Sequence, residues 1–168
     1  MTQAGTPHTP RAAPRAAERL RFLILAAQRE GDRLLTKALL PLDLTPSQAE
    51  VLRILGARAP LTVKQLGALL ICESGSPSRL VSTLISKSLV EAQSVEGDKR
   101  KLHLRLTETG IQAEQTVVKI ETFLHDFIDT RLAEDAMIAA TTALSGLIED
   151  LPSSGAIKAR FPPGPGLP

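Results

Sequence analysis

Residues 44–106 read LTPSQAEVLRILGARAPLTVKQLGALLICESGSPSRLVSTLISKSLVEAQSVEGDKRKLHLRL and contain the starts of three short helices. Two Thr-x-x-Gln capping boxes begin at Thr45 and Thr62, and each is followed by leucines at helical spacing. A third helix is expected from about Ser74, with either Ser74 or Ser76 as its N-cap because a proline follows both. The stretch therefore predicts three consecutive helices.

Beyond the third helix the hydrophobic period changes from 3.6 to 2 residues, which is typical of strands. Leu89–Ser94 and Lys101–Leu106 are expected to pair, with the charged, glycine-containing segment 95–100 as the tip of a hairpin. On the second strand one face is expected to be buried and the other basic. The residues expected on the buried face are Leu102, Leu104 and Leu106.

The flanking segments differ in character. Residues 1–13 lack an apolar period and are expected to form a flexible arm, whereas 14–41 form a helix with apolar residues on more than one face. Such a helix needs a partner, either the core or a second subunit. Two more helices, the second ended by Pro152, are expected within 108–151. Residues 152–168 hold five of the twelve prolines and are expected to be an extended Pro/Gly-rich tail.

The composition excludes several classes of function. Aromatic residues make up only 2%, without Trp or Tyr, so a base-stacking platform for single-stranded nucleic acid is excluded. The single cysteine, Cys72, excludes an internal disulfide and a Cys-rich zinc site. The three scattered histidines and the lack of catalytic or phosphate-cradling motifs predict no metal, no cofactor and no enzyme.

The longest apolar run, Phe22–Ala27, is far too short to span a membrane. The N-terminus also lacks the apolar core of a secretory signal. We therefore expect a cytoplasmic protein with a reduced thiol and no membrane partner.

The net charge of +2 conceals an uneven distribution. Residues 1–37 carry seven basic and three acidic side chains, 74–106 carry six and three, and 107–150 carry two and nine. No acid occurs from Ser74 to Ser88. An ordinary charged surface would explain the totals, but the acid-free helix face favours an anionic partner for the middle of the chain. The acidic segment would then face away from that partner.

Duplex DNA fits this arrangement. A helix face made of small polar residues can enter the major groove, which is about 12 Å wide. Its N-terminal turn directs free backbone N–H groups and a positive dipole at phosphate. Lys99, Arg100 and Lys101 in the hairpin can reach the backbone or a narrow minor groove.

Five motifs in register resemble the MarR family of bacterial transcriptional regulators: Leu44–Gln48, Leu80–Leu84, Leu89–Glu91, Asp98–Arg100 and Leu106–Gly110. The resemblance implies a mainly α fold with a small β-hairpin wing. In that fold a winged helix-turn-helix at 44–107 lies between N-terminal (14–41) and C-terminal (108–151) dimerisation helices. It also implies a homodimer on a pseudo-palindromic double-stranded operator, and repression that is released by a small phenolic or lipophilic effector.

The resemblance carries over to particular residues. The recognition helix is expected at 74–87. Its DNA contacts are expected from Ser74, Ser76, Ser78, Arg79, Thr83 and Lys87, and those of the wing from Asp98, Lys99, Arg100 and Lys101. Arg100 would enter the minor groove, oriented by Asp98 through a charge-assisted pair.

The chain also departs from the family pattern. Ser88 stands where the family has a glycine, so a left-handed backbone there costs about 1 kcal/mol relative to glycine. Ser82 and Thr83 replace a frequent Asp-Arg pair, which removes one cation. Lys101 stands where a small residue commonly follows the wing arginine.

Two other functions stay open from the residues alone. One is a winged-helix protein–protein interaction module without DNA affinity, against which the acid-free face from Ser74 to Ser88 argues. The other is a thiol-based redox regulator acting through Cys72. That residue is also interpretable as a small buried hydrophobic side chain next to the recognition helix.

Overall fold

The computed structural model describes residues 15–71, 76–95 and 98–162, except for the side chains of 95 and 98–101. The chain divides into two units, residues 1–34 and 35–168. Helix α1 (Ala16–Leu39) begins in the first unit, where its apolar side chains are largely exposed, and ends in the second. The predicted N-terminal helix is confirmed, and the arm 1–13 lies outside the described residues.

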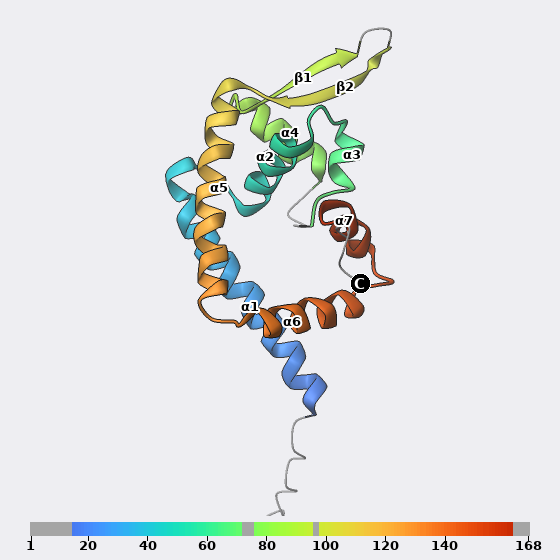
Figure 1. Cartoon of the computed structure of the whole chain (residues 1–168). Coiled ribbons are helices and arrows are strands. Elements are labelled where there is room, and N and C mark those ends of the chain that lie inside the picture. Colours follow the sequence, from blue (N-terminus) through green and yellow to red (C-terminus); the bar gives the residue numbers. More distant parts are fainter. Residues whose placement is uncertain (1–14, 72–75, 96–97, 163–168) are drawn as a thin grey trace, which may run out of the picture. The chain divides into compact units, whose positions relative to one another are not determined.

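The second unit is a winged helix followed by three further helices (Figure 1). Its elements are η1 (Leu40–Leu42), α2 (Pro46–Arg58), α3 (Val63–Gly67), α4 (Pro77–Ser86), β1 (Val90–Val95), β2 (Asp98–Leu106), α5 (Glu108–Asp129), α6 (Glu134–Leu147) and α7 (Pro152–Arg160). Helices α2, α3 and α4 gather beside the base of the β1–β2 hairpin, and α5 continues from β2 along one side of α2 (Figure 1). The predicted fold class, mainly α with a small β-hairpin wing, is confirmed.

Short-range capping sets the helix starts. The hydroxyl of Thr45 accepts the N–H of Gln48 at 3.3 Å, and the Gln48 side chain accepts the N–H of Thr45 at 3.2 Å. Thr62 forms the same capping box at α3, and Thr107 accepts the N–H of Gly110 at 3.0 Å to cap α5. All three helix starts therefore confirm the predictions from sequence.

The core lies between α4, α2 and the base of the hairpin. Its fully buried side chains come from α2, α3, α4, β1 and β2, from the end of α1 and from α5: Leu39, Val51, Leu52, Leu55, Leu66, Leu84, Val90, Leu104 and Val117. Helix α4 buries only its apolar stripe, Leu80, Val81 and Leu84. The opposite face of α4 is consequently held outward by a packed core.

The hairpin is longer than the sequence indicates. β1 and β2 pair antiparallel from Val90↔Leu106 outward, and the pairing continues past an irregularity between Ser94 and Val95 to Val95↔Asp98. The expected tip 95–100 is therefore wrong at both ends, because the backbone of Val95 belongs to β1 and that of 98–100 to β2. The shift leaves extra residues of β2 without a partner on β1, as in a β-bulge.

The expected burial of the β2 leucines is also partly wrong. Leu104 is 1% exposed, whereas Leu102, on the same strand face, is 48% exposed. Leu104 lies near the base of the hairpin, where Leu61 from the α2–α3 connection bonds to its backbone. Leu102 pairs with Ser94 farther out, beyond the reach of the helices.

The C-terminal region corrects another prediction. The last helix was expected to run to about 150 and to be stopped by Pro152, with an extended tail beyond. Instead α6 ends at Leu147, and Pro152 occupies the first turn of the additional helix α7. Proline suits that position because the first helical N–H groups have no partner within the helix. Residues 152–160 are therefore helical, and 163–168 lie outside the described residues.

Helices α5 and α6 present apolar surface to solvent in a single chain. Phe123 is 68% exposed, and α6 contains no buried residue although Ile138 and Leu147 are apolar. A helix with such a face needs a partner surface. In the described parts of the chain, no helix is both long and apolar enough to cross a membrane.

Candidate nucleic-acid interface

Helix α4 begins at Ser76. The Ser76 hydroxyl accepts the N–H of Arg79 at 3.4 Å, and Pro77 follows in the first turn. This settles which serine caps the helix, while Ser74 lies outside the described residues. The backbone N–H groups of the first turn, together with the helix dipole, make this end of α4 attractive to a phosphate.

The outward face of α4 is lined with hydroxyl groups. Ser78, Ser82, Thr83 and Ser86 are all exposed. The Thr83 hydroxyl donates to the carbonyl of Arg79 at 3.0 Å, and the Ser86 hydroxyl donates to the carbonyl of Thr83 at 2.8 Å. Because these two protons are used within the helix, the oxygens are left as acceptors, which suits the amino groups of cytosine or adenine.

Arg79 is the one cation on α4. Its side chain is exposed, and it makes no hydrogen bond or ion pair with any residue that the structure describes. No acid lies on α4 to compete for it. The guanidinium is therefore available to a phosphate or to the O6 and N7 atoms of guanine.

The C-terminal end of α4 closes with a left-handed residue. Ser88 has φ 57°, its N–H donates to the Ile85 carbonyl at 2.9 Å, and the N–H of Leu89 donates to the Leu84 carbonyl at 3.0 Å. This pair of bonds is a Schellman motif, which usually has glycine at the left-handed position. The left-handed conformation, whose cost was considered from the sequence, is the one that Ser88 adopts.

The start of α5 contacts the backbone at Ser88 and Leu89. The Thr107 hydroxyl donates to the Ser88 carbonyl at 2.7 Å, and a Cβ on Gly110 would lie 1.9 Å from the Leu89 carbonyl oxygen. Only glycine permits so close an approach of the two backbones. The end of α4, the start of the hairpin and α5 are thus held together around Ser88.

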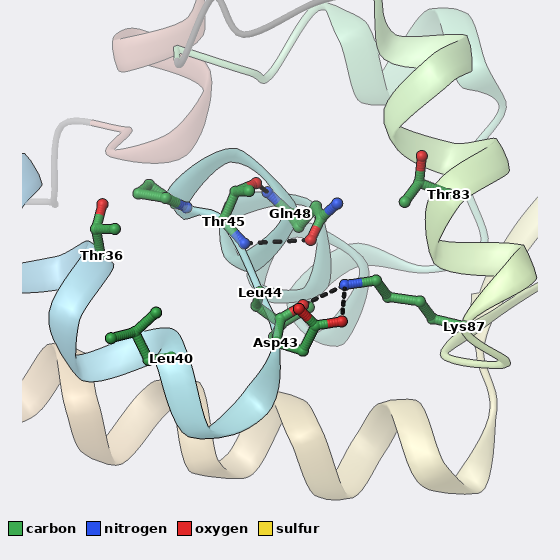
Figure 2. A pocket seen from close by; sticks show the side chains of 9 residues that line it. Thr36, Leu40, Asp43, Leu44, Thr45, Gln48, Thr83 and Lys87 are labelled. Atoms are coloured by element: carbon green, nitrogen blue, oxygen red, sulfur yellow. Dashed lines mark hydrogen bonds and ion pairs between the residues drawn. The ribbon is translucent and has the colours of Figure 1, made fainter.

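Lys87 is engaged within the protein. Its ammonium donates to the Asp43 carboxylate at 2.9 Å and also to the Asp43 carbonyl. Figure 2 shows this side chain reaching from α4 to the loop between η1 and α2. The sequence predicts Lys87 as a DNA contact. In the structure its ammonium pairs with Asp43, and this ion pair connects the end of α4 to the loop before α2.

A cavity of about 420 Å³ opens beside the Lys87–Asp43 ion pair (Figure 2). Its lining comes from the end of α1, η1, the start of α2 and the outward face of α4: Thr36, Leu40, Asp43, Leu44, Thr45, Pro46, Gln48, Thr83 and Lys87. The surface next to Thr83 is therefore concave rather than flat.

The wing lies beside α4. The backbone of Asp98–Lys101 is part of β2, but their side chains are outside the described residues. At the inner part of the same strand Arg105 is exposed and His103 is half-buried. The backbone of the expected wing residues therefore belongs to a strand of the hairpin.

Arg53 is a residue that sequence analysis did not single out. Its Nε donates to Glu121 at 2.8 Å, and its NH1 donates to Glu114, so α2 is tied to α5. Burial alone lowers the pKa of Arg53, but the hydrogen bonds to the two glutamates outweigh it and raise the pKa above its ordinary value. The sequence offers one signal for this site. Glu114 and Glu121 are seven residues apart, which places them two turns apart on one face of α5, where one cation can pair with both.

One candidate residue from the sequence has not been placed so far. Cys72 lies outside the described residues. Within residues 15–71, 76–95 and 98–162, no group of three or more histidine, cysteine, aspartate or glutamate side chains could hold a metal ion.

Comparison with known proteins gives consistent results. A family model for a winged helix DNA-binding domain matches residues 44–110. The multiple antibiotic resistance protein MarR of Escherichia coli (strain K12) is 32% identical over 114 residues, which cover 67% of this chain and 79% of that protein.

Solved structures agree with this relationship. A mutant E. coli MarR complexed with operator DNA superposes with a TM-score of 0.69 at 28% identity, over 77% of this chain and 94% of that one. An organohalide-sensing transcriptional regulator in its 2,4-dichlorophenol-bound form superposes with a TM-score of 0.71 at 16% identity, over 88% and 91% of the two chains. The second similarity is one of fold.

Proposed function

The chain belongs to the MarR family of DNA-binding transcriptional regulators, and from that premise we propose that it is a homodimeric repressor of a pseudo-palindromic operator. One observation carries the proposal: the outward face of α4 is acid-free, is lined with hydroxyls and includes Arg79, whose side chain has no partner among the described residues. The α4 face is the part that would enter the major groove. The relative whose structure contains operator DNA supports this assignment.

The proposed direct contacts are divided between helix and wing. Ser74, Ser76, Ser78, Arg79 and Thr83 would face the major groove and the adjacent phosphates. The wing contacts would come from Asp98, Lys99, Arg100 and Lys101, with Arg100 in the minor groove as the family resemblance implies. Lys87 would act mainly through Asp43, by keeping α4 in place.

A homodimer explains the exposed apolar helices. Ile138, Leu144 and Leu147 on α6 are 56%, 44% and 55% exposed in one chain, and burying them against a second copy removes this surface from water. Two copies also match a two-fold symmetric operator, with one α4 for each half-site. We expect light scattering to give twice the 18.0 kDa mass of one chain.

The effector belongs to the same proposal. We expect release from DNA by a small phenolic or lipophilic molecule, as the family resemblance implies. The dichlorophenol-bound regulator of the same fold is in keeping with this class. A thermal-shift screen of phenolic acids and lipophilic compounds, followed by displacement from operator DNA, would identify it. A regulator of this kind acts in the cytoplasm, where the operator is.

The decisive experiment measures binding to a labelled duplex from the region upstream of the protein's own gene, by fluorescence anisotropy at several salt concentrations. The wild-type affinity should fall steeply with salt. Arg79→Ala should weaken binding by roughly 5- to 150-fold, which corresponds to about 1–3 kcal/mol for a lost base or phosphate contact.

Lys119→Ala is the matched control, because Lys119 is an exposed cation on α5 within the acidic segment. It should leave the affinity within about twofold of the wild type, as for most surface substitutions. Equal losses in the two variants would remove α4 as the DNA-reading surface. A wild-type protein with no operator shift at low salt would instead favour a module without DNA affinity.

A further inference from the structure

Helix α7 is docked on the winged helix. The Arg160 guanidinium in its last turn donates to the carboxylate of Glu50 on α2, and Arg58, also on α2, donates to the Ala159 carbonyl. On α7 itself Ser154 and Ala156 are only 6% and 5% exposed. The helix returns to the α2–α4 group after α6 (Figure 1). Polar contacts with two α2 side chains therefore hold α7 against the winged helix.

Glu50 links α7 to the backbone of Ile71. It is 8% exposed, and its Oε1 atom, which receives Arg160, also accepts the N–H of Ile71 at 3.0 Å. Ile71 lies five residues before Ser76, the N-cap of α4. One buried carboxylate on α2 thus contacts both the C-terminal helix and the backbone of Ile71.

The charge on Glu50 explains why Arg160 matters at this point. A buried carboxylate is stable as an anion only when cations and N–H groups compensate it. Arg160 supplies a cation, and the side chain of Arg160 is itself only 25% exposed. Loss of that cation would favour a shift of Glu50 toward water, and Glu50 would release the Ile71 N–H as it moved.

We propose that α7 is a positioning element for DNA recognition: Arg160 holds Glu50, and Glu50 holds the backbone of Ile71, five residues before the N-cap of α4. The proposal rests on the function assigned to α4 above. Reading the major groove with α4 while the wing contacts its own groove requires both at a fixed relative position. When only a fraction of molecules holds that position, the apparent affinity falls by the same fraction.

The test compares four proteins for binding to the operator and to an unrelated duplex of equal length. Arg160→Ala should weaken operator binding roughly 3- to 30-fold, the usual range for a coupling contact, and should change binding to unrelated DNA much less. The double variant Glu50→Gln, Arg160→Ala should recover most of the operator affinity, because the amide still accepts the Ile71 N–H and carries no charge to compensate.

Lys158→Ala is the control for charge. Lys158 is on the same helix, 66% exposed and 3.9 Å from Glu149, so its removal changes the net charge equally without touching Glu50. It should leave the operator affinity within about twofold. The proposal is overturned if Arg160→Ala behaves like Lys158→Ala, or if operator and unrelated DNA lose affinity together.

Amide hydrogen exchange separates this proposal from the proposed function. Arg160→Ala should speed exchange in the peptide that ends at Ile71, and the Glu50→Gln partner should slow it again. This measurement needs no DNA. A wild-type protein without operator affinity would refute the proposed function, while unchanged exchange at Ile71 would refute the positioning role of α7.

Discussion

Replacing Ser88 by glycine should stabilise the protein, because Ser88 has a left-handed backbone with φ 57°. That conformation costs a residue with a side chain about 1–2 kcal/mol. Glycine avoids the cost but gains freedom in the unfolded chain, worth about 0.5–1 kcal/mol. The net gain is about 0.5–1 kcal/mol, or roughly 1–4 °C in Tm for a chain of this length.

The structural contacts of Ser88 survive the change. The N–H bonded to Ile85 and the carbonyl bonded to Thr107 are both backbone groups. Ser88→Gly therefore removes strain without removing a described interaction. The gain is a stability effect, and operator affinity should be unaltered.

Ser82→Gly is the matched control, since Ser82 is an exposed serine in the middle of α4. The same substitution there should destabilise the protein by about 0.5 kcal/mol, because glycine is a poorer helix former than serine. Urea unfolding followed by far-UV circular dichroism, at one protomer concentration, measures both. A lower midpoint for Ser88→Gly, like that of Ser82→Gly, would refute the strain argument.

Three further substitutions test other parts of the structure. Gly110→Ala should destabilise by about 1–3 kcal/mol, because the new methyl group meets a backbone carbonyl, whereas Gly146→Ala, with open space around it, should stabilise slightly; thermal unfolding measures both. Arg53→Met should lower stability by about 1–2 kcal/mol in urea, since two partly buried glutamates lose their cation. Lys87→Met should weaken operator binding without lowering the salt slope by a full unit, because Asp43 already neutralises that ammonium; a full-unit decrease would mean a direct phosphate contact.

The helix starts were predictable because each depends on residues three positions apart. Thr45, Thr62 and Thr107 all cap as expected, and Ser76 does so at α4. Capping bonds and the hydrophobic period of a helix both involve residues that are close in the sequence. A short stretch of sequence is therefore enough to predict them. The winged-helix order and the acid-free face of α4 follow from it.

The wing shows where such reasoning ends. Alternation along β2 identifies which face a leucine is on, but it says nothing about how far the helices extend beneath that face. Leu104 is buried and Leu102 is exposed for this reason. The C-terminal prolines misled in a similar way, because Pro152 begins a helix as readily as it ends one.

The basic residues show most clearly what the sequence predicts and what only the fold decides. The sequence places Arg79 on an acid-free helix and offers Ser74 or Ser76 as its cap, but it does not distinguish Lys87 from any other lysine near DNA. The partners of Lys87, Arg53 and Arg160 lie 44, 61 and 110 residues away in the chain. Such ion pairs depend on which backbone segments the packed core brings within reach. The local sequence therefore determines the polar, acid-free face of α4. The long-range ion pairs of Lys87, Arg53 and Arg160 depend on the tertiary structure.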